Sequence, residues 1–319
     1  MQHSSPLRSQ QKHNHMLNKK YPAFVQIVEV SPRDGLQNID HHVSTEVKAE
    51  LINQLSMSGV NHIEVGSFVS PKWVPQMANT EELIQILKQP DNSHYIVLTP
   101  NSKGLDRAVE CGVRDVAVFA AASETFSQKN TNCSIEESLL RFKPIVQRAL
   151  DAGIRVRGYV SCVLGCPYEG EVDSNKVAEV SQALINMGCY EVSLGDTIGV
   201  GTPVKAQRMV ETVLKVIPAE KIALHFHDTC GQALANILAC LEYGISTIDA
   251  SVAGLGGCPY ADGASGNLAT EEVVYMLDGM GIKTGVNLNQ LIKAGQFITQ
   301  QLGIQNSSRV ATSNSPSNP

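Results

Sequence analysis

Apolar residues in this chain gather in short runs rich in valine, isoleucine and alanine, separated by longer and more polar segments. Short apolar runs rich in β-branched residues, each bounded by turn-forming residues, predict β-strands that are buried on both faces. The runs occupy residues 24–30, 62–65, 95–100, 115–121, 155–162, 190–196, 221–228 and 246–254. The pattern therefore predicts eight strands.

The segments between the runs have a different periodicity. In residues 45–59, Val47, Leu51, Ile52 and Leu55 recur at the spacing of one face of an α-helix. Gly59 follows, and a glycine at that place can end a helix. We therefore expect a crossover helix between consecutive strands.

The alternation of eight strands with helices predicts an α/β fold, the TIM (β/α)8 barrel, which takes about 250 residues. An open doubly wound sheet is the alternative, but no G-x-G-x-x-G motif follows the first strand. Residues 287–303 predict an additional C-terminal helical segment packed on the barrel. We expect a disordered N-terminal extension at 1–22, a catalytic domain at 23–305 and a disordered tail at 306–319.

Composition narrows the possible partners. The chain has 319 residues, of which 43% are hydrophobic and 18% charged, and its formal net charge is −6. A negative chain whose one basic pair is Lys19-Lys20 has no field for gathering nucleic acid. No apolar run is long enough to span a bilayer. The eight scattered cysteines are typical of free thiols in a reducing compartment.

The first 22 residues bear on location. They contain no acid and are rich in glutamine, histidine and serine, but they have one arginine and no clear amphipathic face. We expect a cytoplasmic protein of bacterial type, with the mitochondrial matrix as the location if this segment is a transit peptide.

The stretch ALHFHD, residues 223–228, carries the first chemical signal. Because side chains alternate along a strand, His225 and His227 point to one side while Leu224 and Phe226 point to the other, toward the helices. A single histidine is more often a core residue, but a pair at the carboxyl end of a barrel strand indicates a metal site.

Two further ligands come from neighbouring strands. Asp34 follows the first run and Asn267 follows the last, and in a closed barrel these strands lie beside each other and beside the strand of the histidines. A carboxylate, an amide and two imidazoles (Asp34, Asn267, His225 and His227) suit a divalent cation, Mg²⁺ or Mn²⁺, better than structural zinc.

Other polar residues gather at the strand ends. Arg33 is either an ion-pair partner of Asp34 or a fixed cation for an oxyanion, and its place at the mouth favours the second interpretation. Glu64 and Asp196 are candidates for orienting the ligands or Arg33. Cys258 lies in the glycine-rich segment GLGGCPYADGASGN; a free cysteine is more often a small hydrophobic residue, but in this segment it is a candidate proton donor or nucleophile. Candidate substrate-binding residues are Arg33, Gln37, Ser67, Ser193 and Thr197.

Several long segments resemble signature segments of the 3-hydroxy-3-methylglutaryl-CoA lyase family. They are SPRDGLQN, SFVSPKWVPQM, AASETFSQKNTNCSIEES, RGYVSCVLGCPYEG, SLGDTIGVGTP, HFHDT, GQALAN and GLGGCPYADGASGNLATE. The resemblance runs from about residue 24 to residue 300. The family more often has glycine at Ser31 and tyrosine at Cys230, and neither change affects a proposed ligand.

The resemblance implies a metal-dependent TIM barrel that cleaves 3-hydroxy-3-methylglutaryl-CoA to acetyl-CoA and acetoacetate, a retro-Claisen step of leucine degradation and ketone-body formation. Arg33 would stabilise the enolate, and Cys258 would protonate it. Asp34 is the first candidate for the general base and His225 the rival. An acyl-CoA substrate and a homodimer are expected.

Two other interpretations compete. A related barrel could join an acyl-CoA to a keto acid, or act as a metal aldolase on a hydroxy-keto acid, and the segment with Cys258 separates these from a lyase that needs a proton donor. An inactive barrel kept as a binding module is disfavoured because every expected mouth residue is present.

Overall fold

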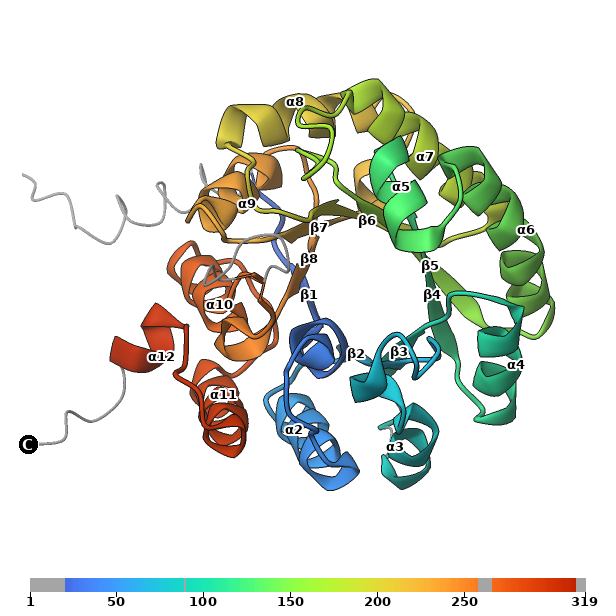
Figure 1. The fold of residues 1–319 in the computed structure, drawn as a ribbon. Helices are drawn as coiled ribbons and strands as arrows, with labels where there is room; N and C mark the ends of the chain where they lie inside the picture. The colour runs from blue at the N-terminus through green and yellow to red at the C-terminus, as the bar shows by residue number, and fades with distance from the viewer. Residues whose placement is uncertain (1–20, 89, 258–265, 314–319) are drawn as a thin grey trace, which may run out of the picture.

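The computed structural model describes residues 21–88, 90–257 and 266–313. Eight parallel strands close into a barrel in sequence order, with β8 pairing back onto β1 (Figure 1). The strands are β1 Gln26–Glu29, β2 His62–Ser67, β3 His94–Leu98, β4 Asp115–Ala121, β5 Arg155–Ser161, β6 Glu191–Asp196, β7 Ile222–Phe226 and β8 Thr247–Ala250. Each strand lies within or beside its predicted run, so the predicted barrel is confirmed.

The helices form a ring outside the strands (Figure 1). They are α2 Thr45–Met57, α3 Thr80–Ile86, α4 Ser102–Glu110, α5 Glu124–Thr131, α6 Ile135–Asp151, α7 Ser174–Met187, α8 Pro203–Val213, α9 Ala233–Leu241, α10 Thr270–Gly279, α11 Leu288–Leu302 and α12 Arg309–Ser313. The helix expected at 45–59 is α2, and Gly59 follows it at φ +96°, a backbone conformation that favours glycine. The C-terminal helical segment is α11, which packs on α2.

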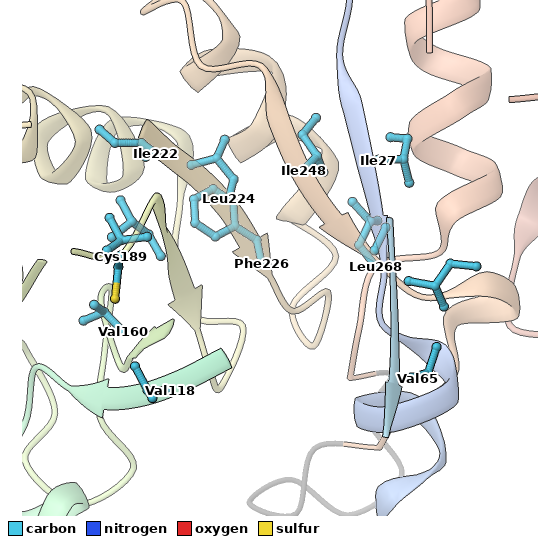
Figure 2. Packing of buried hydrophobic residues seen from close by; sticks show 14 of the residues in the cluster. Ile27, Val65, Val118, Val160, Cys189, Ile222, Leu224, Phe226, Ile248 and Leu268 are labelled. Carbon is cyan, nitrogen blue, oxygen red and sulfur yellow. The ribbon is translucent and has the colours of Figure 1, made fainter. Parts of the chain in front are cut away.

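The main hydrophobic core lies between the strands and the helices, where side chains on the outer faces of the strands pack together (Figure 2). On β7, Ile222, Leu224 and Phe226 belong to this core and are 1% exposed or less. His225 alternates with them and faces the barrel interior, where it lies beside Asp249. The alternation predicted for ALHFHD is therefore confirmed for these strand residues.

The buried side chain of Glu29 links the two strands that close the barrel. Glu29 ends β1, and its Oε1 accepts the backbone N–H groups of Ser31 (3.0 Å) and Val252 (2.8 Å). Its Oε2 accepts the hydroxyl of Thr270 at 2.7 Å, at the start of α10. These contacts join the ends of β1 and β8, which places the loops after the two strands beside each other.

The C-terminal end differs from the expected disordered tail. Residues 306–313 contain α12, Ser308 and Ala311 are almost fully buried, and the N–H of Arg309 donates to Glu272 Oε1 at 2.8 Å. Residues 314–319 and most of the predicted extension, 1–20, lie outside the described residues. Within the described part of the chain, no helix is both long and apolar enough to cross a bilayer.

Candidate active site and metal centre

The site begins with the turn that follows β1. Ser31–Gly35 form a short π-helical turn in which the N–H groups of Arg33, Asp34 and Gly35 all donate to the carbonyl of Val30, at 3.2, 2.8 and 3.1 Å. One carbonyl at the strand end therefore holds the turn in place. The turn presents Arg33 and Asp34 at the carboxyl ends of the strands, where TIM barrels carry their chemistry.

Arg33 is held between two carboxylates. Its Nε and Nη2 lie 2.8 and 2.7 Å from Glu64 Oε2, and its Nη1 donates to Asp34 Oδ1 at 2.8 Å. Nη1 also lies 3.4 Å from Gln37 Oε1. Burial alone would lower the pKa of Arg33, but Glu64 and then Asp34 raise it above its ordinary value. The guanidinium is therefore a permanent cation with a fixed orientation.

Asp34 and the two histidines form one donor cluster. His225 Nε2 lies 3.3 Å from His227 Nε2 and 3.9 Å from Asp34 Oδ2. The three side chains offer ligand atoms that all lie within 4.8 Å of one another. The sequence predicted this convergence of side chains that are distant in the chain.

Charge keeps Asp34 ionised and His227 neutral, and it acts on His225 in the opposite direction from His227. Burial alone would raise the pKa of Asp34, yet Arg33 and then the two histidines hold it well below its ordinary value. Burial and the neighbouring His225 lower the pKa of His227 to about 4. Burial also disfavours a charged His225, but the hydrogen bond and the charge of Asp249 raise its pKa.

Asn267 lies beside the cluster, at the place predicted for the fourth ligand. His227 and Asn267 pair as an isolated antiparallel bridge, and Asn267 Nδ2 donates to Asp34 Oδ2 at 2.8 Å and to the carbonyl of Leu255 at 3.2 Å. The amide nitrogen, as assigned, therefore faces Asp34. Ligation of a cation would use Oδ1, so it requires the amide to turn over.

The donor set fits a divalent cation. Ligand atoms about 2.1 Å from an octahedral ion lie about 3 Å from their neighbours. The observed separations of 3.3 and 3.9 Å are close to that spacing. Two imidazole nitrogens that face each other beside a carboxylate are best satisfied by a cation between them.

Four other predicted residues contact protein groups. Asp196 accepts the N–H groups of Val200 and Gly201, at 3.3 and 2.8 Å, and so holds the loop after β6. Ser67 donates to the carbonyl of Leu98 at 3.3 Å, Ser193 donates to Asp249 Oδ2 at 2.8 Å, and Thr197 Oγ1 accepts the N–H of Cys162 at 2.9 Å. Cys258 lies outside the described residues.

Sequence reasoning missed a buried layer just inside the barrel. Asp249 on β8 contacts His225, Ser193 and Arg157, and Arg157 also donates to the hydroxyl of Tyr159 at 3.0 Å. The signal was present, because Asp249 lies in the apolar run STIDASVAG and Arg157 lies in RVRGYVSC. A charged residue inside a strand buried on both faces needs a partner across the barrel.

Fold and donor set together define the class: a (β/α)8-barrel enzyme with a candidate divalent-cation centre at the carboxyl ends of its strands. A family model described as HMGL-like matches residues 24–298. A mitochondrial hydroxymethylglutaryl-CoA lyase of Bos taurus is 58% identical over 91% of this chain and 90% of its own length. The chain belongs to the hydroxymethylglutaryl-CoA lyase family, which confirms the resemblance drawn from the motifs.

Solved structures of lyases from this family are similar to the chain in fold and in sequence. The hydroxymethylglutaryl-CoA lyase of Pseudomonas aeruginosa has a TM-score of 0.91 and 55% identity, covering 92% of this chain and 98% of that one. An HMG-CoA lyase from Acinetobacter baumannii in complex with coenzyme A and 3-methylmalate has a TM-score of 0.87 and 37% identity, covering 93% and 97%.

Proposed function

We propose that this chain cleaves 3-hydroxy-3-methylglutaryl-CoA to acetyl-CoA and acetoacetate with the side chains gathered around Asp34, His225 and His227. The observation that carries the proposal is that donor cluster with the Arg33 guanidinium beside it, in a lyase-family chain. In the reaction the C3 hydroxyl loses its proton, the bond between C2 and C3 breaks, and C2 gains a proton.

Asp34, His225, His227 and Asn267 are the residues that would hold the cation. The oxygen and imidazole donors favour Mg²⁺ or Mn²⁺ over a thiolate-binding metal. When bound, such an ion supplies Lewis acidity toward substrate oxygens. The position of Asn267, next to Asp34 and paired with His227, supports its inclusion.

Arg33 is our choice for stabilising the enolate oxygen. Glu64 and Asp34 fix its orientation, so the positive charge is in place before the negative charge develops. A guanidinium has five N–H donors, and the contacts with Glu64, Asp34 and Gln37 use four of them. One N–H is left for the substrate, counting contacts to the described residues.

Proton transfer has two candidates at the hydroxyl end. Asp34 has both carboxylate oxygens engaged, Oδ1 by Arg33 and Oδ2 by Asn267, whereas His225 has its Nε2 directed into the donor cluster. Either side chain lies where a substrate hydroxyl at the cluster would meet it. Cys258 stays our candidate for protonating C2, because it follows Leu255, whose carbonyl accepts a hydrogen bond from Asn267 Nδ2 at 3.2 Å.

Of the other predicted polar residues, one is placed for a substrate contact and four bind protein groups. Gln37 extends the Arg33 cluster and is the best placed for a direct substrate contact. Ser67, Ser193, Thr197 and Asp196 bind backbone groups or Asp249, which supports a role in holding the strand ends in position.

The acyl-CoA partner is proposed from the Acinetobacter structure with coenzyme A. Residues 1–22 remain candidates for a transit peptide, as the mitochondrial name of the bovine relative suggests, with a cytoplasmic location otherwise. A homodimer is proposed from the family resemblance, and sedimentation of the purified chain would test it.

The test is acetoacetate release from 3-hydroxy-3-methylglutaryl-CoA by the purified full-length chain. We expect acetoacetate and acetyl-CoA in equal amounts, loss of turnover with EDTA, and recovery with Mg²⁺ or Mn²⁺. Absence of turnover while Mn²⁺ binding is demonstrated would contradict the proposed reaction but leave the metal centre in place. Condensation of acetyl-CoA with a keto acid would then be assayed.

A further inference from the structure

The strongest feature that the proposed chemistry does not use is Asp249, in the middle of the barrel. It lies on β8 directly beside His225 in the strand register, and its side chain is fully buried. Asp249 Oδ2 lies 3.3 Å from His225 Nδ1 and 2.8 Å from Ser193 Oγ. Asp249 therefore contacts the side of the imidazole that faces away from the donor cluster.

Arg157 fixes the charge of this carboxylate. Its Nη1 and Nη2 donate to the two oxygens of Asp249 at 3.0 and 2.7 Å, and neither side chain is exposed. Arg157 also pairs with Glu191 Oε1 at 2.8 Å, but its two contacts with Asp249 lower the pKa of that carboxyl against the effect of burial, so Asp249 is a carboxylate. Each of its neighbours is consequently a donor, because an ionised carboxylate only accepts hydrogen bonds.

The tautomer of His225 follows from this. If Nδ1 carries the hydrogen and donates it to Asp249, Nε2 carries a lone pair. That lone pair faces His227 Nε2 at 3.3 Å and Asp34 Oδ2 at 3.9 Å. His227 differs, since its Nδ1 has no hydrogen-bond partner among the described residues. One imidazole of the pair is thus anchored and the other is not.

We propose that Asp249 is a positioning residue that holds His225 as the Nδ1–H tautomer and directs its Nε2 into the metal centre, with Arg157 and Ser193 holding Asp249 in turn. A carboxylate on the far nitrogen of a metal-binding histidine fixes the ring and typically contributes about 10- to 100-fold in metal affinity. The role in metal binding rests on the proposed function, whereas the tautomer can be measured without metal or substrate.

The competing explanation is a plain structural ion pair between Arg157 and Asp249. The chain provides a matched control at the opposite end of the barrel. There Asp115, also buried, pairs with Arg155 at 2.5 Å and with His94 Nδ1 at 3.2 Å. Loss of that carboxylate should affect stability alone, because His94 begins β3, at the end of the barrel away from the donor cluster.

The variant that tests the proposal is Asp249→Asn, with Asp115→Asn as its control. Asp249 Oδ2 accepts from Arg157 Nη1, Ser193 and His225, and Oδ1 accepts from Arg157 Nη2. An asparagine offers one oxygen in place of two and carries no charge, so His225 Nδ1–H loses its ionic acceptor and the Nε2–H tautomer gains population. The buried aspartate of the serine-protease triad behaves in this way, because its replacement by asparagine leaves the geometry intact but gives the wrong histidine tautomer. Ser193→Ala removes one support of Asp249 and should act in the same direction more weakly.

The first readout is the tautomer in metal-free protein, from two-bond proton–nitrogen spectra of the chain labelled at its nine histidines, with His225→Gln used for assignment. For the neutral ring, recorded at alkaline pH because Asp249 raises the pKa of His225, we expect Nδ1–H in the wild type and in Asp115→Asn, and a larger Nε2–H fraction in Asp249→Asn. An Nε2–H tautomer in the wild type overturns the proposal, even if Asp249→Asn does not fold.

The second readout is Mn²⁺ affinity, measured by electron paramagnetic resonance. We expect Asp249→Asn to bind Mn²⁺ about 10- to 100-fold more weakly and Asp115→Asn to bind within about twofold of wild type. Unchanged Mn²⁺ affinity in folded Asp249→Asn contradicts the positioning role. A wild-type chain that binds Mn²⁺ without cleaving the acyl-CoA would contradict the proposed function alone.

Discussion

The barrel contains two clusters of the same three residue types, and only one of them contacts the candidate active site. The upper triad is Arg157, Asp249 and His225; the lower triad is Arg155, Asp115 and His94, the first residues of β5, β4 and β3. In both, a buried aspartate lies between an arginine and a histidine Nδ1. Residue type alone therefore does not distinguish them.

The surroundings of each histidine separate the two clusters. Arg155 Nη2 lies 2.8 Å from His94 Nδ1, so that nitrogen faces a donor as well as the carboxylate, and its tautomer is not fixed by Asp115. The lower arginine and histidine are 44% and 35% exposed, whereas Arg157 is fully buried and His225 is 12% exposed. The upper triad can act in the chemistry because it is buried, which holds one tautomer of His225, and because the other nitrogen of that ring lies near the carboxylate of Asp34.

The largest expected effect is the difference in kcat between replacing an arginine at the carboxyl end of the barrel and replacing one at the opposite end. Arg33→Met should lower kcat about 10³-fold, because it removes the preoriented cation for the enolate, and should leave Mn²⁺ affinity near wild type. Arg155→Met at the lower triad should keep kcat within about twofold. Steady-state kinetics with Mn²⁺ binding measured in parallel makes the comparison.

Arg33→Met also leaves Glu64 buried without its cation, so stability needs a control. The double variant with Glu64→Gln removes that carboxylate, and it should regain stability while kcat stays low. If kcat is unchanged in folded Arg33→Met, the oxyanion role of Arg33 is wrong.

The next contrast concerns the histidines. His227→Ala removes a proposed ligand, so Mn²⁺ affinity and kcat should fall together, by about 100-fold. His94→Ala at the lower end should change neither by more than about twofold. The measurement is titration of both variants with Mn²⁺, followed by assay of kcat at saturating metal. Equal losses in His227→Ala and His94→Ala would contradict the assignment of the metal centre to the carboxyl end of the barrel.

A third prediction concerns Glu271, a buried carboxyl group that, unlike Asp249 and Asp115, has no arginine partner among the described residues. Glu271, on α10, accepts the N–H of Ala253 at 3.0 Å, and burial raises its pKa from 4.5 to about 8. The folded state therefore holds a proton on Glu271 that the unfolded chain releases, so this group by itself lowers the free energy of unfolding as pH rises from about 5 to about 8. Glu271→Gln should remove this fall, which we expect to be on the order of 3 kcal/mol.

His62 and His227, whose pKa values are lowered to about 3 and about 4, act in the opposite direction, so the comparison with a variant isolates the contribution of Glu271. Urea unfolding of wild type and Glu271→Gln at pH 5 and pH 8 measures the effect. Relative to Glu271→Gln, the wild type should lose stability between these two pH values. A stability difference between wild type and Glu271→Gln that is the same at pH 5 and pH 8 would show that Glu271 is ionised in the folded protein.

The smallest expected effect is at Thr197. Thr197→Val removes the acceptor for the N–H of Cys162, whose φ of +62° is unusual for a residue other than glycine. We expect a loss of about 1 kcal/mol, or a Tm lower by about 2–4 °C, with KM within about twofold. Calorimetry and kinetics check this; a tenfold rise in KM would instead assign Thr197 to substrate binding.

The features of the fold and the site that depend on local periodicity could be predicted from the sequence. The alternation in ALHFHD placed His225 opposite Leu224, and the strand count then brought Asp34 beside the histidine pair. The contact of Asp249 with Arg157 depends on the register of β8 and on a side chain that reaches across from β5, which no single segment encodes.

The C-terminal end shows a second limit. Its polar composition indicated disorder from residue 306, but α12 is anchored by a contact between the N–H of Arg309 and Glu272, and by the burial of Ala311. A short segment can be ordered by the surface that it packs on, which its own composition does not reveal.

The most direct test of a metal centre at the upper end of the barrel is a crystal structure of the chain grown with Mn²⁺, with anomalous scattering used to locate the ion. We predict an anomalous peak among Asp34 Oδ2, His225 Nε2 and His227 Nε2. A peak at the lower triad, or none in the donor cluster at a Mn²⁺ concentration that restores turnover, would contradict the account.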